Sequence, residues 1–337
     1  MIILNPSKLL FYLMLFMGTL ISISSNSWPA TWMGLEINLL AFIPLMSTKN
    51  NMMSSEATMK YFIIQAMASS MLLTLIIMNS MLLNLNNMIM NSIISTTLLM
   101  KMGAAPFHMW FPTVMEGLSW MNCIILMTWQ KLAPFVILSY LNWNQTMMTL
   151  IMLSSVIIGS IGGLNQTSTR KIMAYSSINH IGWMILSMMM SENLWLFYFI
   201  SYSVLSSTVL IILHNLSAIH LNQIPLSWNS ASMKFMVSIN LMSLGGLPPF
   251  MGFLPKWMII QNSFYSESQF VVLIMILCTL ITLFYYMRMV INSFLITVNQ
   301  IKWNYPSYKI NNFNLMSYLT GMSLFTLPLY SLLFNII

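Results

Sequence analysis

The sequence predicts an all-α polytopic membrane protein with about eleven transmembrane helices. Of its 337 residues, 58% are hydrophobic and 5% are charged, which is about a fifth of the charged share of a soluble globular domain. Apolar stretches of about 20 residues, the length that crosses a hydrocarbon core of about 30 Å, recur along the chain. We therefore expect one membrane domain over residues 1–337, with no room for a separate soluble domain.

Polar breaks between the apolar stretches give the expected helices. They cover residues 8–24, 30–47, 58–79, 89–112, 119–141, 146–164, 171–190, 194–219, 234–260, 269–298 and 313–335.

Basic residues support this count, because consecutive loops alternate between the two sides of a membrane. The loops expected on one side hold or border Lys8, Lys49, Lys60, Arg170, Lys171, Lys234, Arg288, Lys302 and Lys309, and the loops of the other side hold no basic residue. This is the positive-inside pattern. It predicts that the N-terminus lies on the positive side and the C-terminus on the other side.

Two of the expected helices are interrupted by the same pattern. Residues 103–112 read GAAPFHMWFP and residues 246–255 read GLPPFMGFLP, and both fit G-x-x-P-F-x-x-x-x-P. Proline inside a helix removes a backbone hydrogen bond, which a membrane tolerates where protein or a water-filled cavity satisfies the freed groups. Because the copies lie five helices apart, they point in opposite directions. We therefore expect inverted five-helix repeats over residues 8–141 and 146–298, with an extra C-terminal helix at 313–335.

Four ionisable side chains fall inside the expected helices: Glu36, Lys101, Lys131 and Lys256. A charge at the bilayer centre costs about 2.5–3.5 kcal/mol on insertion scales, so such groups are candidates for a proton relay. Burial disfavours the charged form of a lysine and a nearby carboxylate favours it, so moving Glu36 relative to Lys101 could load or release a proton. Each lysine could instead be an inert paired cation. Lys256 and Glu36 could also reach the membrane surface.

His180, in AYSSINHIGWM, is a fifth candidate. The two broken segments are 143 residues apart, and the same offset carries Glu36 to Asn179, which precedes His180. His180 is therefore either a relay member or a hydrogen-bonded core residue. The other three histidines are interpreted as structural or interfacial.

Motifs for common cofactors are missing from the sequence. Cys123 and Cys278 lie far apart, and no C-x-x-C pair or cluster of four ligands is present to hold zinc or an iron–sulfur centre. Neither G-x-G-x-x-G nor G-x-x-x-x-G-K-[ST] occurs, so nucleotide binding by these loops is not predicted. Nucleic acid is not an expected partner.

Five stretches, in order, resemble the antiporter-like, proton-pumping subunits of respiratory complex I in their animal mitochondrial form. They are GLEINLLAFIP, KMGAAPFHMWFP, MTWQKLAP, GGLNQTSTRKIMAYSSINHIGWM and SLGGLPPFMGFLPKW. The resemblance implies proton translocation across the mitochondrial inner membrane, coupled to electron transfer from NADH to ubiquinone, through water-filled half-channels. It places the family carboxylate on Glu36 and its paired lysine on Lys101. The central lysine falls on Lys131 and the terminal lysine on Lys256.

The resemblance also implies partners and a location. FMN, iron–sulfur clusters and ubiquinone would be bound elsewhere in the complex, and the neighbours would be other antiporter-like and small membrane subunits, with lipids such as cardiolipin. The positive face would be the matrix side and the C-terminus would lie on the intermembrane side. Bacterial relatives have fourteen helices, so eleven implies a form without the first three. A stand-alone cation/proton antiporter and a structural membrane spacer remain alternatives.

Overall fold

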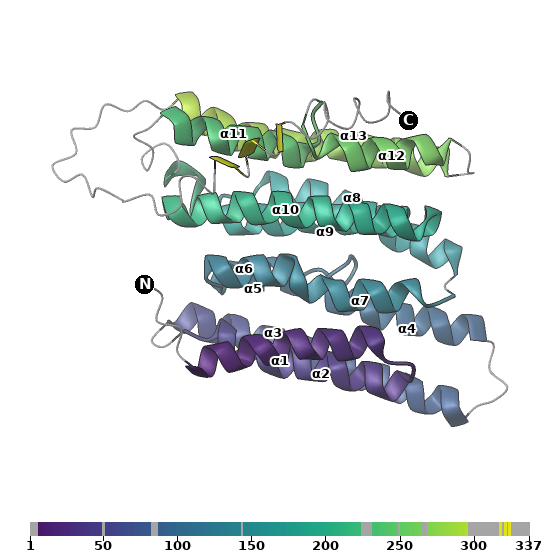
Figure 1. Cartoon of the computed structure of the whole chain (residues 1–337). Coiled ribbons are helices and arrows are strands. Elements are labelled where there is room, and N and C mark those ends of the chain that lie inside the picture. Colours follow the sequence, from purple (N-terminus) through teal and green to yellow (C-terminus); the bar gives the residue numbers. More distant parts are fainter. Residues whose placement is uncertain are drawn as a thin grey trace. The chain divides into compact units, whose positions relative to one another are not determined.

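The chain folds into helices that follow one another along the sequence (Figure 1). The computed structural model describes residues 6–48, 51–81, 87–142, 144–223, 231–248, 250–264, 268–295, 317, 318, 320, 321, 323 and 324. Two compact units make up the fold, Met1–Ser155 and Val156–Ile337, here named the first and second units.

The first unit begins with three long apolar helices, α1 (Pro6–Ser24), α2 (Trp28–Met46) and α3 (Met52–Met81). Helices α1 and α2 pack along each other, and they are closest at Gly18. A Cβ atom on Gly18 would lie 2.9 Å from the backbone nitrogen of Asn38. This close approach depends on a residue without a side chain, as is common between membrane helices.

The fourth expected helix is broken, as the sequence predicts. Helix α4 (Asn87–Met102) ends before Gly103, whose φ of 78° lies in the left-handed region that glycine adopts without strain. Helix α5 (Trp110–Gly117) begins seven residues after that glycine. The interruption therefore coincides with the G-x-x-P-F pattern.

A further interruption was not predicted. The continuous helix expected at 119–141 is divided at Thr128 into α6 (Trp120–Met127) and α7 (Trp129–Ser139). The Thr128 hydroxyl donates to the carbonyl of Ile124 at 2.7 Å, a contact that bends helices. Pro134 has no N–H to offer the turn before it. Together these two residues account for the break.

The second unit repeats the glycine break. Helix α8 (Gln145–Leu164) crosses the boundary between the units, and Gly246, with a φ of 83°, follows α11 and precedes α12 by seven residues. The other elements are α9 (Thr169–Met190), α10 (Glu192–Leu216), the short 3-10 helix η1 (Leu221–Gln223), α11 (Ala231–Gly245), α12 (Phe253–Ser263) and α13 (Gln269–Leu295). The expected helix at 313–335 lies largely outside the described residues.

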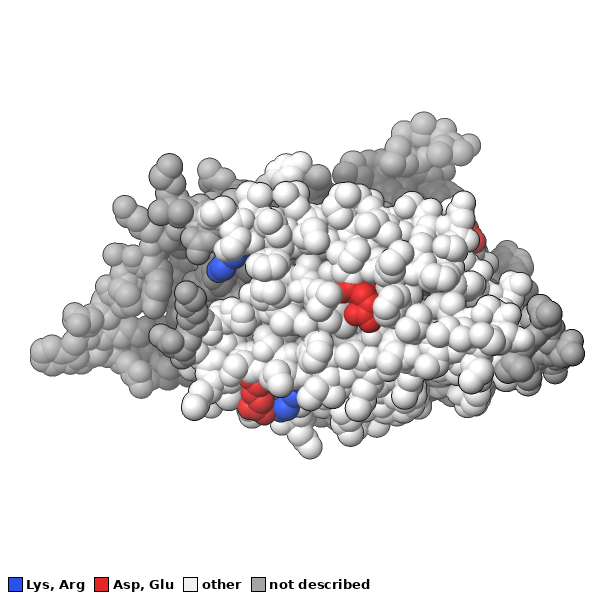
Figure 2. Space-filling view, turned by 90° about the horizontal axis from the view of Figure 1, so that it is seen from below, with Lys and Arg blue, Asp and Glu red and all other residues white. Residues whose placement is uncertain are grey.

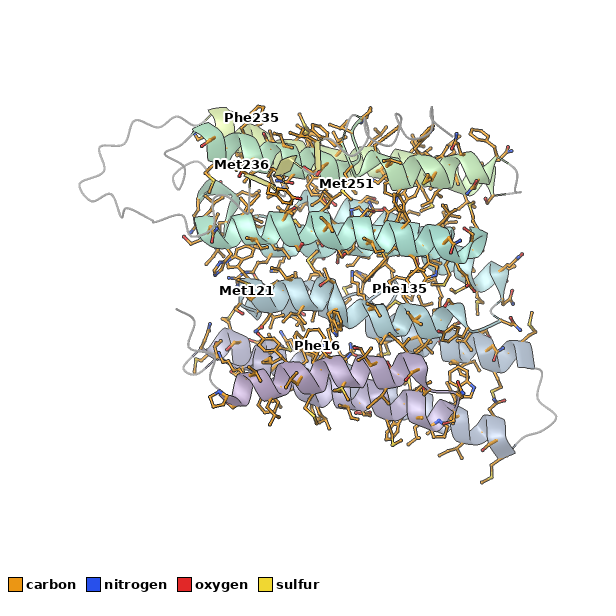
Figure 3. All side chains as sticks on the ribbon, in the orientation of Figure 1. Phe16, Met121, Phe135, Phe235, Met236 and Met251 are labelled. Carbon is orange, nitrogen blue, oxygen red and sulfur yellow. The ribbon has the colours of Figure 1, made fainter. Side chains whose placement is uncertain are left out.

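The described surface is apolar. Seven segments are long and apolar enough to cross a membrane: α1, α2, α3, α6 with α7, α8, α10 and α13. The face drawn in Figure 2 carries few charged side chains. Large apolar side chains project outward (Figure 3), and Met121 and Phe235 are exposed while Phe135 is fully buried. Helices that are apolar on every side are typical of membrane spans, so the described chain is a polytopic all-α membrane protein.

Candidate functional site

Two buried lysines of the first unit line one cavity. Lys101, in the last turn of α4, is 8% exposed, and Lys131, in the first turn of α7, is 1% exposed. The cavity leaves about 20 Å³ open to the centre of a water molecule, and its polar lining consists of both lysines with Asn38, Tyr61, Gln65 and Gln130. A polar cavity needs about 10–15 Å³ of this kind to hold one water. The space between the lysines can therefore be hydrated.

Neutral side chains satisfy the broken end of α4. The Gln65 Nε2 donates to the carbonyl of Lys101 at 3.0 Å, and the Trp110 Nε1 donates to the carbonyl of Met100 at 3.3 Å. The last carbonyls of a helix have no partner within the helix and need donors from elsewhere. Because Gln65 and Trp110 supply them, the cap does not require the Lys101 ammonium, which remains available for proton exchange.

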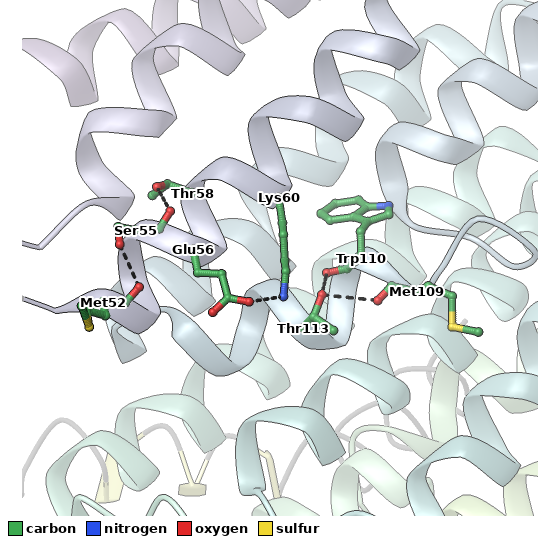
Figure 4. Close-up of polar contacts among 8 residues, drawn as sticks. All are labelled: Met52, Ser55, Glu56, Thr58, Lys60, Met109, Trp110 and Thr113. Atoms are coloured by element: carbon green, nitrogen blue, oxygen red, sulfur yellow. Dashed lines mark hydrogen bonds and ion pairs between the residues drawn. The ribbon is translucent and has the colours of Figure 1, made fainter.

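Glu36 lies near Lys101 without forming an ion pair within 4.0 Å. It is partly exposed on α2, and its charge acts on that of Lys101. The ion pair that the described residues do form is Glu56 with Lys60, one turn apart on α3, at 2.6 Å (Figure 4). Both of its members are exposed, so this pair belongs to the surface. Glu36 is thus the carboxylate available to Lys101.

Lys131 is held beneath an aromatic ring. Its Nζ lies 5.1 Å from the centroid of Phe111, a distance at which a cation is attracted to the ring face. It sits between Thr128 and Pro134, where the helix is loosened. The preceding residue, Gln130, is bonded to side chains of two other helices.

In the second unit, Lys256 spans the break between α11 and α12. It is 6% exposed, and its Nζ donates to the carbonyl of Gly245 at 2.9 Å, the last residue of α11. It also lies 5.9 Å from the Trp183 ring centroid. A cation at a helix C-terminus is favoured by the helix dipole. The side chain therefore turns toward the broken helix rather than toward the membrane surface.

His180 lies in a buried polar cluster on α9. Its Nδ1 is 2.9 Å from the Tyr198 hydroxyl, and its ring centroid is 4.9 Å from that of Tyr202. The neighbouring Asn179 is 2% exposed, and its Oδ1 has no hydrogen-bond partner among the described residues. Helix α12 packs on α9, so His180 and Lys256 share one packed region.

The five predicted residues thus fall into two groups. Glu36, Lys101 and Lys131 meet in the first unit, and His180 and Lys256 lie in the second. The sequence reasoning missed the neutral polar residues around them, which are Asn38, Tyr61, Gln65, Gln130 and Tyr198. Their one local sign is a run of amide and lysine residues inside apolar helices, as in WQK. Among the described residues there is no cluster of three potential metal ligands.

A polytopic all-α fold with two helices broken at glycine, and with a buried lysine beside each break, defines the antiporter-like class of membrane proteins. Residues 25–282 match the family described as NADH:quinone oxidoreductase/Mrp antiporter, transmembrane. NADH-ubiquinone oxidoreductase chain 2 of Anopheles gambiae is 51% identical over 314 residues, which cover 91% of each chain. This chain therefore belongs to the NADH:quinone oxidoreductase/Mrp antiporter family, among relatives of the chain 2 type.

Solved structures show the same fold. A chain of respiratory complex I from Thermus thermophilus with bound aureothin has a TM-score of 0.82 at 20% identity, covering 95% of this chain and 78% of that chain. A chain of the Mrp complex from Dietzia sp. DQ12-45-1b has a TM-score of 0.75 at 15% identity, covering 84% of this chain and 59% of that chain. At these identities the likeness concerns the fold.

Proposed function

We propose that this chain translocates protons across the mitochondrial inner membrane as a membrane-arm subunit of NADH:ubiquinone oxidoreductase. The observation that carries the proposal is the 51% identity with a chain 2 relative over 91% of both chains. The chain supplies no redox centre, so FMN, iron–sulfur clusters and ubiquinone belong to other subunits. Electron transfer there would drive the proton steps here.

The relay would use Glu36, Lys101, Lys131, His180 and Lys256. A change in the separation of Glu36 and Lys101 alters the balance between the charged and neutral forms of the lysine. A proton released by Lys101 would pass through the hydrated cavity to Lys131, since both lysines line it. His180 and Lys256 would serve the second unit in the same way. Water-filled half-channels would connect each group to one side of the membrane.

The topology that we infer has eleven transmembrane helices with inverted repeats over residues 8–141 and 146–298, and an extra helix at 313–335. Two correspondences support the repeat. Gly103 and Gly246 share a left-handed backbone at the same place in the broken helices. In addition, a Cβ on Gly18 would crowd the nitrogen of Asn38, and one on Gly159 would crowd the nitrogen of Asn179, 141 residues later in both cases.

The inferred surroundings follow from the charge pattern. The N-terminus and the basic loops would face the matrix, and the C-terminus would face the intermembrane space. The flanks would contact neighbouring antiporter-like and small membrane subunits. The apolar outer surface would contact lipids, including cardiolipin, whose anionic head groups suit basic loops.

Substitution of one buried lysine tests the proposal. Lys131→Met keeps an apolar side chain of similar length in the cavity, so the complex should assemble. NADH-driven proton uptake into vesicles that hold the purified complex should fall by about tenfold or more, as expected when a proton-transfer group is lost. NADH oxidation should fall with it through coupling. The control is Lys60→Met, which removes an exposed lysine. Full proton uptake in an assembled Lys131→Met complex would contradict the proposal and favour a structural spacer.

A stand-alone cation/proton antiporter is the second candidate. It is favoured by the family match, which includes Mrp antiporters, and by the similar fold of the Mrp chain. Native separation of source membranes in mild detergent, with in-gel NADH oxidation and mass identification of the chain, distinguishes the two. Migration only within a large NADH-oxidising assembly supports the first candidate. A small assembly without that activity supports the antiporter.

A further inference from the structure

The amide of Gln130 is fixed by two other helices. Its Nε2 donates to the Asn38 Oδ1 at 3.0 Å, and its Oε1 accepts a longer bond of 3.5 Å from the Tyr61 hydroxyl. Asn38 belongs to α2 and Tyr61 to α3, and both are 3% exposed. Gln130 itself lies on α7. One amide therefore has its orientation set by side chains from both neighbouring helices.

This amide borders the cavity shared by the two lysines. Gln130, Asn38 and Tyr61 all line it, together with Lys101 and Lys131. A primary amide has two N–H donors and an oxygen with two acceptor positions. The bonds to Asn38 and Tyr61 use one donor and one acceptor position. One donor and one acceptor position remain, which is what a water molecule between the lysines needs.

We propose that Gln130 is a positioning residue that holds the water through which a proton passes between Lys101 and Lys131. This inference rests on the proposed function of the two lysines. In the step, the Lys101 ammonium gives a proton to the water, and the water gives a proton to the neutral amine of Lys131. The amide neither gains nor loses a proton.

A neutral group suits this position for an electrostatic reason. The charged or titratable groups around the cavity are Glu36 on α2, Tyr61 on α3, Lys101 on α4 and Lys131 on α7. A carboxylate at residue 130 would pair with the adjacent ammonium and hold it in the charged form. An amide binds the same water without trapping the proton. The clamp from Asn38 and Tyr61 then keeps its donor and acceptor directed at the water.

The test uses Gln130→Met and Tyr61→Phe in the assembled complex. Gln130→Met removes the amide at similar volume, and Tyr61→Phe removes only the donor that orients it. Each should lower NADH-driven proton uptake by about fivefold, the effect of one lost hydrogen bond, with normal assembly. The ratio of NADH oxidation rates in H₂O and D₂O should rise in both, because proton transfer through the cavity becomes slower. A merely structural fault would leave that ratio unchanged.

Gln145→Met is the matched control, because Gln145 is exposed at the first residue of α8 and should leave uptake and the isotope ratio unchanged. Lys131→Met, measured in parallel, separates the two proposals. If Lys131→Met stops uptake and Gln130→Met and Tyr61→Phe behave like the control, the positioning role is overturned and the relay stands. If Lys131→Met pumps normally, the relay itself fails. Should Gln130→Met not assemble, Tyr61→Phe decides the question alone.

Discussion

Gly246→Ala should displace a lysine without unfolding the helix break. Gly246 has a φ of 83°, and an L-residue in the left-handed region costs about 1–2 kcal/mol. Its new Cβ would lie 2.8 Å from the Lys256 Nζ and 3.0 Å from its Cδ. These atoms belong to a flexible side chain, so the lysine can move away. It would then lose its hydrogen bond to Gly245, and a bond from a charged donor contributes about 1.5–3 kcal/mol.

The two costs together are large enough to detect but fall short of what abolishes folding of a large assembly. We therefore expect reduced but measurable assembly of the complex, and a loss of NADH-driven proton uptake per assembled complex that is greater than the loss of assembly. The assays are native gels for the amount of complex and vesicle acidification for proton uptake.

Gly245→Ala is the control, one residue away. A Cβ there would meet nothing nearer than 3.7 Å, and alanine stabilises a helix relative to glycine by about 0.5–1 kcal/mol. This variant should assemble and pump as the unchanged chain does. If Gly246→Ala pumped as well as Gly245→Ala, the contact of Lys256 with the end of α11 would have no part in proton transfer, and the reasoning would fail.

Three further substitutions test other contacts. Tyr198→Phe removes the 2.9 Å bond to His180, so it should cost about 1 kcal/mol of stability and slow proton uptake, while Tyr140→Phe at an exposed position should change neither. Gly117→Ala should sharply reduce the amount of assembled complex on native gels, because its Cβ would strike the α3 backbone and overpacking costs about 1–3 kcal/mol. Lys60→Gln breaks only an exposed ion pair, so the amount of complex and its rate of pumping should stay unchanged.

The positions of the helices and of both glycine breaks could be predicted because they depend on local sequence. A glycine and a proline within an apolar run end a helix wherever the rest of the chain lies, and the two copies end α4 and α11 at the same point in the pattern. The buried lysines could be selected because a charge inside a long apolar segment is costly. The break at Thr128 was missed, since a threonine and a proline six residues apart give a much weaker pattern.

The neutral partners could not be predicted because their contacts join distant parts of the chain. Asn38 and Gln130 are 92 residues apart, and Tyr61 and Gln130 are 69 apart. Amide and hydroxyl side chains are so frequent in this sequence that no single one stands out. A constant offset of 143 paired Glu36 with Asn179, but the glycine contacts instead pair Asn38 with Asn179 at an offset of 141. The spacing of one motif therefore does not fix residue correspondences elsewhere.

The two breaks show where local coding ends. Their backbones match, yet the end of α4 is capped by the neutral side chains of Gln65 and Trp110, while the end of α11 is capped by the Lys256 ammonium. A hydrogen bond from a charged donor is about twice as strong as one between neutral groups. A proton leaving Lys101 would leave its cap intact, but a proton leaving Lys256 would weaken the cap that it forms. The shared pattern determines where each helix stops, and the distant partners determine whether that stop responds to protonation.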